Sequence, residues 1–269
     1  MALDQKTQSV LHRIGHSAQT RVDEQKKRLP LEQLQAEWAA LPRKANPFTA
    51  LFGADGLHVI AEVKLASPSR GDIAPELDPV AVAEDYLKHG ARALSVLTEP
   101  FYFKGQLDYL RAIRKAFPQA SLLQKDFVVD PYQIYEAALA GADAILIIVA
   151  LLGAKESRFL HDMARSLGLS VLVEVHDREE LEIAKDFGAE LIGINNRNLK
   201  DLSISLDTTH QLLPYCPKDA YLICESGLKT HEDLLAMRKA GCHGFLVGTS
   251  LMQTGTPGPA LQRILYGEG

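Results

Sequence analysis

Several apolar segments of this 269-residue chain end in charged, amide or hydroxyl side chains. Carboxylates and ammonium groups that lie close together in a protected site acquire the shifted pKa values on which acid–base catalysis depends. A structural network of ion pairs is the alternative explanation, and it is weaker for the whole set than for any single member. The set consists of Glu62 and Lys64 in the segment 57–64, Lys125 in 121–127, Glu174 in 169–176, Asn195 in 190–196, and Glu225 and Ser226 in 220–226.

Two glycine-containing segments near the C-terminus have the composition of a phosphate site. They are Glu225-Ser226-Gly227 and Gly248-Thr249-Ser250. Glycine allows a ligand to approach backbone N–H groups closely, and the hydroxyls add hydrogen-bond donors. Arg197, which follows another apolar segment, can add a charge-assisted hydrogen bond. These residues predict a pocket for a phosphate group beside the acid–base set.

The segments that carry these residues alternate with amphipathic stretches. Short runs rich in apolar and β-branched residues are typical of parallel strands buried on both faces. The stretches between them often end in glycine and a small residue, as at Gly141-Ala142, which is typical of a helix C-terminus. Asp130-Pro131 has the composition of a helix start. The apolar runs are 57–64, 92–99, 121–127, 143–150, 169–176, 190–196, 220–226 and 243–250.

A helix, a tight turn and a strand thus repeat along the chain, which predicts an α/β fold of the closed (β/α)8 TIM-barrel type. A doubly wound open sheet is the alternative, but it usually needs fewer strands. No linker divides residues 1–269, so we expect one domain, with residues 1–48 as an N-terminal helical extension over the bottom or the rim of the barrel. The carboxyl ends of the strands would converge on one face and gather the polar set there.

Composition limits the classes of function open to the chain. A net charge of −5 and a pI near 6.0 argue against a basic surface for nucleic acid. The longest apolar run, 144–154, is too short to span a bilayer, and the N-terminus lacks the apolar core of a signal peptide. Three cysteines without C-x-x-C spacing indicate neither a disulfide framework nor a zinc site, and no nucleotide-binding motif occurs. We expect a cytoplasmic protein, monomeric or weakly homo-oligomeric, that acts on a small molecule without metal, cofactor, nucleic acid or membrane.

Ordered motifs along nearly the whole chain resemble those of indole-3-glycerol phosphate synthase. The stretch 59–71, VIAEVKLASPSRG, resembles the first-strand motif of that family, and the helical extension also fits. The resemblance implies a TIM-barrel carboxy-lyase of tryptophan biosynthesis. Its reaction closes the ring of 1-(2-carboxyphenylamino)-1-deoxyribulose 5-phosphate, with loss of CO2 and water, and needs no metal or organic cofactor. Further matches are LTEP at 97–100, FKG at 103–105, LQKDF at 123–127, LVEVH at 172–176, GINNRNL at 193–199, ESG at 225–227 and VGTSL at 247–251.

The resemblance also implies roles for the polar residues. Lys125 would protonate the ketone oxygen as the aromatic ring carbon attacks it. Glu174 and Glu62 would serve as acid and base in the later loss of a hydroxyl group. Lys64 would be a second acid or a partner of the substrate carboxylate, and the division of roles among these three stays open. The orienting residues would be Asn195, Glu225 and Ser226.

The remaining implied residues bind the substrate. An apolar wall would receive the anthranilate ring, although its phenylalanines could equally be plain barrel packing. Two positions depart from the family pattern: Leu65 stands where Lys or Arg is frequent, and Gln106 stands where Ser is common. They bear on loop contacts and substrate affinity and not on proton transfer. The implied phosphate and substrate-binding residues are Ser67, Arg197, Gly227, Gly248, Thr249, Phe103 and Phe127.

Two other functions compete with the synthase. Phosphoribosylanthranilate isomerase is a similar phosphate-binding barrel, but its acid–base pair is a Cys on the first strand and an Asp on the sixth. Here Glu62, Lys64 and Asn195 occupy those strand ends. A catalytically silent paralogue that binds an aromatic sugar phosphate would be expected to lose proton-transfer residues, and all of them are present.

Overall fold

Eight parallel strands close into a barrel in a computed structural model that describes residues 10–42, 48–68, 70–199 and 201–267. Their order is β1-β10-β9-β8-β7-β6-β5-β4, and β1 pairs with both β4 and β10. The TIM barrel is therefore confirmed and the open sheet is wrong. The strands are β1 (Val59–Val63), β4 (Ala93–Leu97), β5 (Leu122–Lys125), β6 (Ala144–Ile148), β7 (Ser170–Val175), β8 (Leu191–Asn195), β9 (Tyr221–Glu225) and β10 (Gly244–Val247).

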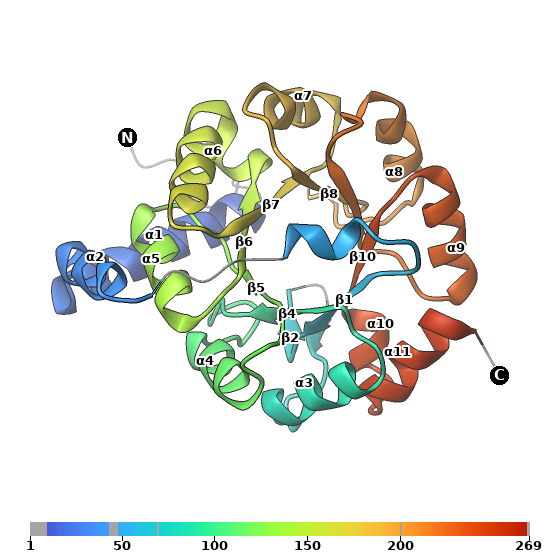
Figure 1. The fold of residues 1–269 in the computed structure, drawn as a ribbon, viewed down its shortest axis with the longest axis horizontal. Coiled ribbons are helices and arrows are strands. Elements are labelled where there is room, and N and C mark those ends of the chain that lie inside the picture. Colours follow the sequence, from blue (N-terminus) through green and yellow to red (C-terminus); the bar gives the residue numbers. More distant parts are fainter. Residues whose placement is uncertain (1–9, 43–47, 69, 200, 268–269) are drawn as a thin grey trace.

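Helices between the strands form the outer ring (Figure 1). The Asp130 carboxylate accepts a hydrogen bond from the backbone N–H of Tyr132 at 2.9 Å and caps α5, as the Asp-Pro pair predicts. Gly141 ends that helix with a φ of 90°, which glycine adopts without strain. The helices are α3 (Pro79–Lys88), α4 (Leu107–Ala116), α5 (Pro131–Ala140), α6 (Val149–Ser166, broken at Gly153), α7 (Arg178–Asp186), α8 (Asp207–Leu212), η2 (Leu213–Tyr215), α9 (His231–Ala240), α10 (Thr249–Met252) and α11 (Pro257–Tyr266).

The N-cap of α4 is the position of Gln106, one of the two departures from the family pattern. Its backbone is extended, with φ −147° and ψ 142°, but its side chain makes no capping hydrogen bond. A serine hydroxyl there can accept from a backbone N–H of the first turn. We expect Gln106→Ser to raise the free energy of unfolding by about 1 kcal/mol, measured by urea denaturation. Gln106→Ala is the control, and an equal gain in both variants would contradict the capping explanation.

Side chains alternate along each strand between the barrel interior and the layer under the helices. In β1, Val59, Ala61 and Val63 pack in the outer layer, whereas Ile60 belongs to the interior core. The same alternation directs the polar side chains near the carboxyl ends of the strands into the interior. The interior core includes Ile60, Ala93, Leu123, Ala144, Leu146, Leu172, Leu191, Ile223 and Leu246.

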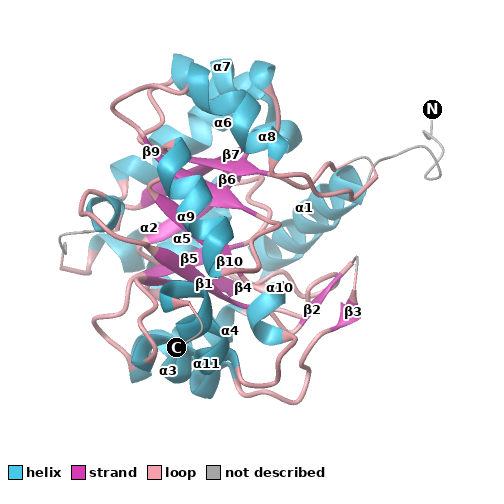
Figure 2. Cartoon of the chain, turned by 90° about the vertical axis from the view of Figure 1, so that its right-hand side faces the viewer, coloured by secondary structure: helices cyan, strands magenta, loops and turns pink. Residues whose placement is uncertain are grey.

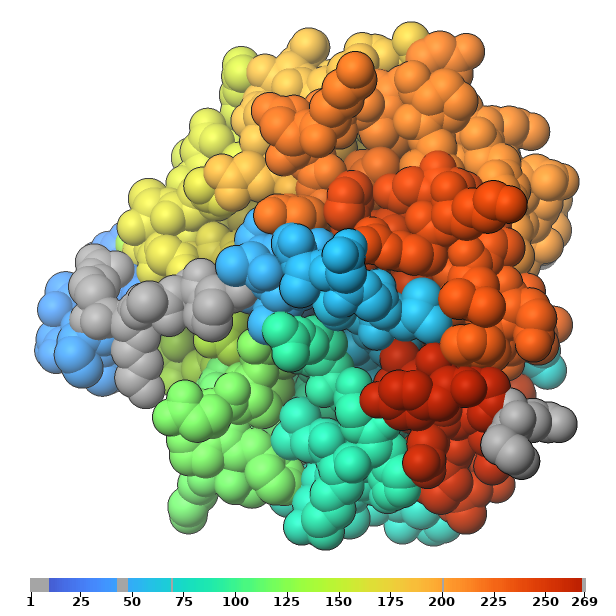
Figure 3. Space-filling model, turned by 45° about the vertical axis from the view of Figure 1, so that its right-hand side comes forward, coloured from blue at the N-terminus to red at the C-terminus, as the bar shows by residue number. Residues whose placement is uncertain are grey.

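A short turn, η1 (Thr49–Phe52), closes the amino-terminal end of the barrel. Phe48 and Phe52 are fully buried against the interior core, with ring centroids 5.9 Å apart. The Thr49 hydroxyl donates to Ser170 at the start of β7 over 2.9 Å. The turn crosses the barrel centre in blue in Figure 1, and its segment lies between the green and orange parts of the chain in Figure 3. The residues that cover the bottom thus lie at and beyond the expected boundary of the extension at residue 48.

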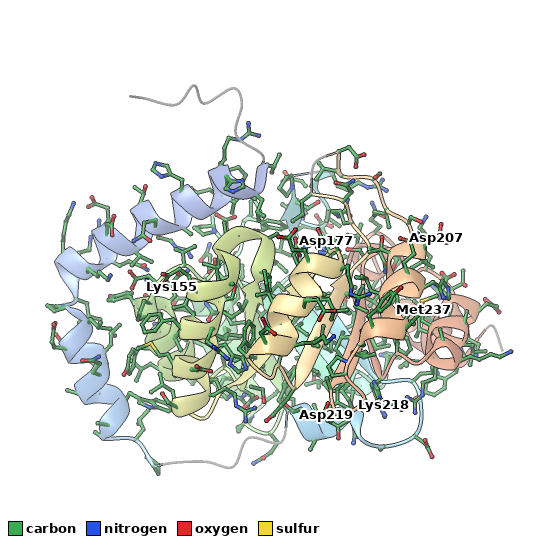
Figure 4. All side chains as sticks on the ribbon, turned by 90° about the horizontal axis from the view of Figure 1, so that it is seen from above. Lys155, Asp177, Asp207, Lys218, Asp219 and Met237 are labelled. Carbon is green, nitrogen blue, oxygen red and sulfur yellow. The ribbon has the colours of Figure 1, made fainter. Side chains whose placement is uncertain are left out.

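The extension itself runs from the carboxyl-terminal end of the barrel along its side. Helix α1 (Val10–Arg28) contacts α5 and α6, and α2 (Leu31–Ala39) contacts α5. Figure 2 shows the start of α1 at the same end of the molecule as a hairpin of β2 (Ala66–Ser67) and β3 (Gly71–Asp72). The hairpin lies between the predicted strands 57–64 and 92–99, where the sequence predicts no strand. Figure 4 labels Asp177 and Asp207 toward this end and Lys218 and Asp219 toward the other.

No helix in the described ranges could cross a membrane.

Candidate active site

A cavity of about 600 Å³ lies at the carboxyl ends of the barrel strands. Its volume is in the range of small-molecule sites. Ser67 is the one predicted site residue that does not line it, because Ser67 is buried in β2, opposite Gly71 of β3. The predicted residues that do line it are Glu62, Lys64, Phe103, Lys125, Phe127, Glu174, Asn195, Arg197, Glu225, Ser226, Gly227, Gly248 and Thr249.

Lys125 is the centre of the polar part of the cavity. Its Nζ lies 3.0 Å from Glu174 Oε2 and 2.9 Å from Glu225 Oε2. The three residues come from β5, β7 and β9, which are alternate barrel strands, and alternate strands supply side chains to the same interior layer. The two carboxylates are 5% and 2% exposed, so the ammonium is held in a site that excludes most water.

The two carboxylates that share Lys125 have opposite pKa shifts. Burial alone would lower the pKa of Lys125, but Glu174 and Glu225 raise it above the ordinary value, so the ammonium stays charged. Burial opposes ionisation of Glu174, yet Lys125 and His176 hold its pKa well below the usual range. For Glu225, burial raises the pKa to about 7; Lys125 opposes this shift and the Glu174 carboxylate adds to it. The pair therefore offers one permanent carboxylate and one carboxyl group able to hold a proton near neutral pH.

The position of Glu225 depends on small and polar neighbours. A Cβ atom on Gly193 of β8 would lie 2.0 Å from Glu225 Oε1, so only glycine leaves room for the carboxylate. That oxygen is buried and makes no hydrogen bond within the described part of the chain. The Asn196 amide donates to the backbone oxygens of Glu225 (3.0 Å) and Ser226 (3.1 Å) and supports the strand end. Asn196 was not predicted, although its place beside Asn195 is a signal.

Glu62 and Lys64 form an ion pair beside this centre, which agrees with their spacing of two residues along one strand. The Ser95 hydroxyl donates to Glu62 Oε2 at 3.4 Å. A Cβ atom on Gly248 would lie 2.6 Å from Glu62 Oε1. Gly248 therefore makes room for a carboxylate as well as lining the predicted phosphate end.

The predicted phosphate end carries two guanidinium groups. Thr249 begins the short helix α10, directly after Gly248. Gly227 has a φ of 92°, which favours glycine. Arg70, which was not predicted, lines the cavity together with Arg197. Burial lowers the pKa of Arg197 and the nearby Arg70 lowers it further, as expected for two cations that face one space.

An apolar wall faces the charged centre. The rings of Phe103 and Phe127 have centroids 5.8 Å apart, and Leu146 and Ile148 of β6 complete the wall. The Glu99 carboxylate accepts hydrogen bonds from the backbone N–H groups of residues 101, 102 and 103, which fixes the loop that carries Phe103. A planar apolar group can therefore lie close to Lys125.

His176 contacts the site and was not predicted to do so. It directly follows β7 and is the last residue of the predicted strand 169–176. Asp177 does cap α7, but His176 Nε2 also lies 3.3 Å from Glu174 Oε1. The signal was its spacing of two from Glu174, which places both side chains on the same face of the strand. In the described ranges, no three His, Cys, Asp or Glu side chains are grouped for a metal ion.

Known sequences match this chain over most of its length. A family model described as indole-3-glycerol phosphate synthase matches residues 11–263. Indole-3-glycerol phosphate synthase of Acidithiobacillus ferrooxidans is 45% identical over 256 residues, which cover 94% of this chain and 97% of that protein. The protein of the same name from Alkaliphilus metalliredigens is 41% identical and covers 96% and 98%. The one from Chlorobium luteolum is 52% identical over 75% and 77%.

Solved structures share the fold at low sequence identity. A 3-hexulose-6-phosphate synthase superposes with a TM-score of 0.64 at 14% identity, over 79% of this chain and all of that one. A mutant tryptophan synthase α-subunit from Pyrococcus furiosus gives a TM-score of 0.59 at 14% identity, over 77% and 97%. These similarities concern the barrel architecture alone.

Proposed function

The chain belongs to the indole-3-glycerol phosphate synthase family, and on this premise we propose which of its residues carry out the reaction of the family. The protein is a carboxy-lyase of tryptophan biosynthesis that converts 1-(2-carboxyphenylamino)-1-deoxyribulose 5-phosphate into indole-3-glycerol phosphate. The observation that carries the assignment of residues is the shared contact of Lys125 with Glu174 and Glu225, beside an apolar wall.

Lys125 is the general acid of ring closure in this proposal. The ring carbon that bears the carboxylate attacks the sugar ketone, pushed by the aniline nitrogen, and the ketone oxygen takes a proton from the ammonium. The resulting iminium accepts the electrons released when CO2 leaves, so decarboxylation draws on the substrate itself. The charged state of Lys125, which its two carboxylate partners stabilise, supports this role.

Loss of the hydroxyl group then requires an acid and a base. Glu174 and Glu62 are the carboxylates assigned to this step, and Lys64 is a second acid or a partner of the substrate carboxylate. The remaining members of the catalytic set orient the substrate hydroxyls and the neighbouring charges; they are Asn195, Glu225 and Ser226. Each proton transfer assisted by a positioned side chain contributes about 10²–10⁴-fold to the rate.

The phosphate lies, in this proposal, at the end of the cavity formed by Gly227, Gly248 and Thr249, with Arg197. Backbone N–H groups and a guanidinium suit a dianion. Arg70 adds a second cation at the cavity wall. Anchoring this end holds the reacting carbons near Lys125, which lowers the entropic cost of ring closure. Ser67 does not line the cavity, and its contact with the phosphate stays a prediction.

The anthranilate ring is placed against Phe103 and Phe127. We expect Phe127→Ala to raise KM about tenfold or more, because Phe127 is half-buried and a bound ring that covers it would gain about 1.5–3 kcal/mol of apolar contact. Steady-state kinetics with the carboxyphenylamino deoxyribulose phosphate measure this. Phe101→Ala is the matched control, since Phe101 is 67% exposed and does not line the cavity. Equal KM values in the two variants would mean that Phe127 only packs the barrel.

The proposal is tested by adding the substrate to the purified protein without metal or cofactor and following indole absorbance and fluorescence. Product formation that persists in a chelator supports the reaction without a metal, and its loss in Lys125→Ala supports the assignment of the acid. Tight binding of the substrate without product would favour the silent paralogue.

We further propose that residues 1–269 form a single domain, with 1–48 as its extension. We also propose that the protein is cytoplasmic, that it is monomeric or weakly homo-oligomeric, and that it binds no nucleic acid.

A further inference from the structure

The two carboxylates that share Lys125 are not equivalent in their other contacts. Glu174 Oε2 pairs with Lys125, and Glu174 Oε1 lies 3.3 Å from His176 Nε2 in an ion-pair contact that lacks hydrogen-bond geometry. Glu225 Oε1 is buried and has no hydrogen-bond partner within the described residues. The reaction needs an ionised carboxylate as a base, and this asymmetry distinguishes Glu174 from Glu225 as that group.

His176 is itself held by a second carboxylate. Its Nδ1 lies 3.0 Å from Glu180 Oε2, and its backbone N–H donates to the same oxygen at 2.8 Å. Glu180 lies in the first turn of α7, whose N-cap Asp177 accepts from the Glu180 backbone N–H at 2.9 Å. The ring is 11% exposed and the Glu180 side chain 15%. The helix start therefore fixes the plane and the direction of the imidazole.

A carboxylate lies beside each ring nitrogen of His176. The Nδ1 contact with Glu180 is a hydrogen bond and the Nε2 contact with Glu174 is an ion pair, and two nearby negative charges favour the imidazolium. Glu174 of β7 and Glu180 of α7 are the carboxylates that contact the ring. Lys125 of β5 contacts the far oxygen of Glu174 and not the ring. The carboxylates outweigh the effect of burial and raise the pKa of His176 to about 10.

We propose that His176, held by Glu180, is a positioning residue that keeps Glu174 ionised and oriented as the base of the reaction, while Glu225 remains the carboxyl group that can carry a proton. A cation on each side of a carboxylate favours its charged form. Positive and negative side chains alternate from the cavity to the helix start, in the order Lys125, Glu174, His176 and Glu180. This inference rests on the proposed function for the identity of the reaction, and on geometry for the state of Glu174.

The first test is the pH dependence of kcat/KM in His176→Gln, which removes the cation. A base must be deprotonated to act, so activity is lost as pH falls through its pKa. Without His176 that pKa rises from its depressed value toward the ordinary value of a glutamate, and we expect the variant to lose activity at a higher pH on the acid side than the wild type. Glu180→Gln, which keeps a hydrogen-bond acceptor but removes its charge, should move the limb in the same direction by less.

Glu182→Gln is the matched control. Glu182 lies on the same helix and pairs with Arg178 and Lys185, not with His176. It should leave the acid limb unchanged. A His176→Gln enzyme with normal circular dichroism and a lower kcat at every pH, but an unshifted acid limb, would reduce His176 to a structural role and overturn the proposal.

A second measurement separates this inference from the proposed function. Carbon-13 NMR of the glutamate carboxyls, assigned with Glu174→Gln, follows the ionisation of Glu174 directly in wild type and His176→Gln. A pKa of Glu174 that rises by about one unit or more in the variant supports the positioning role even if the wild type forms no indole product. An unchanged Glu174 titration overturns it, whatever the activity.

Discussion

Lys125→Ala is expected to lower kcat for ring closure by about 10³–10⁴-fold, the upper part of the range for loss of a positioned acid. Lys125 contacts both Glu174 and Glu225 and faces the apolar wall, so the variant loses the proton donor and the positive charge near the ketone oxygen together. Stopped-time indole fluorescence measures the rate. The binding constant of the product, measured by fluorescence titration, should change only a few-fold, because the phosphate contacts remain.

Lys155→Ala is the control for this experiment. Lys155 is exposed on α6 and is labelled in Figure 4. Removing it should leave kcat unchanged. Lys125→Arg keeps a cation, but its planar group is far less acidic and cannot occupy the same point between the carboxylates. Turnover close to that of the wild type in Lys125→Ala would eliminate Lys125 as the principal acid.

Gly193→Ala is expected to lower kcat by about 10²-fold although Gly193 has no side chain to contribute to catalysis. The added Cβ would lie 2.0 Å from Glu225 Oε1 and 3.1 Å from its Cδ, so the carboxylate must move away from Lys125. A displacement of about 1 Å at a reacting group can cost this much. Kinetics of the variant measure the loss, and urea denaturation measures the accompanying decrease in stability.

Gly244→Ala separates displacement of Glu225 from simple overpacking. Its Cβ would lie 2.7 Å from Ile223 and Phe52, on the side of the plug and not beside the Glu225 carboxylate. Overpacking there should cost about 1–3 kcal/mol of stability without a comparable loss of kcat. Glu225→Asp added to Gly193→Ala shortens the crowded side chain and should recover stability. Normal turnover in Gly193→Ala would show that the position of Glu225 is not critical.

Both predictions rest on the interior layer that alternate strands share. Glu62, Lys125, Glu174 and Glu225 come from β1, β5, β7 and β9, one from each alternate strand. Such a layer brings together side chains that are 49 and 100 residues from Lys125 in the chain. A change of register by one residue in any of these strands would send its side chain to the helix layer.

Much of the architecture could be predicted because it depends on local chemistry. The apolar runs, the Asp-Pro starts and the glycine ends each have a short-range physical cause. They predicted the strands, the helix boundaries such as the Asp130 cap, and the face on which polar side chains gather. The resemblance to a family added the reaction. The plug of Phe48 and Phe52 could not be predicted in this way, because its partners lie on distant strands.

The site shows the same division. From the sequence alone, Glu62 and Lys64 could be placed on one strand face, since two residues repeat the side-chain direction. Ser67 and His176 share a strand end with predicted residues, yet the structure turns Ser67 into a hairpin and His176 toward Glu174. Spacing predicts the face on which a side chain lies. It does not determine how the chain bends after the strand ends.

The residue types, their strand ends and the barrel that gathers them are properties of the sequence by itself. Only the tertiary structure decides that Glu174 is ionised while the pKa of Glu225 rises to about 7. The two are the same amino acid at equivalent places on β7 and β9. Their pKa values differ because Coulomb energy depends on distance and burial. Closure of the barrel places Lys125 and His176 beside Glu174, whereas one oxygen of Glu225 has no hydrogen-bond partner among the described residues.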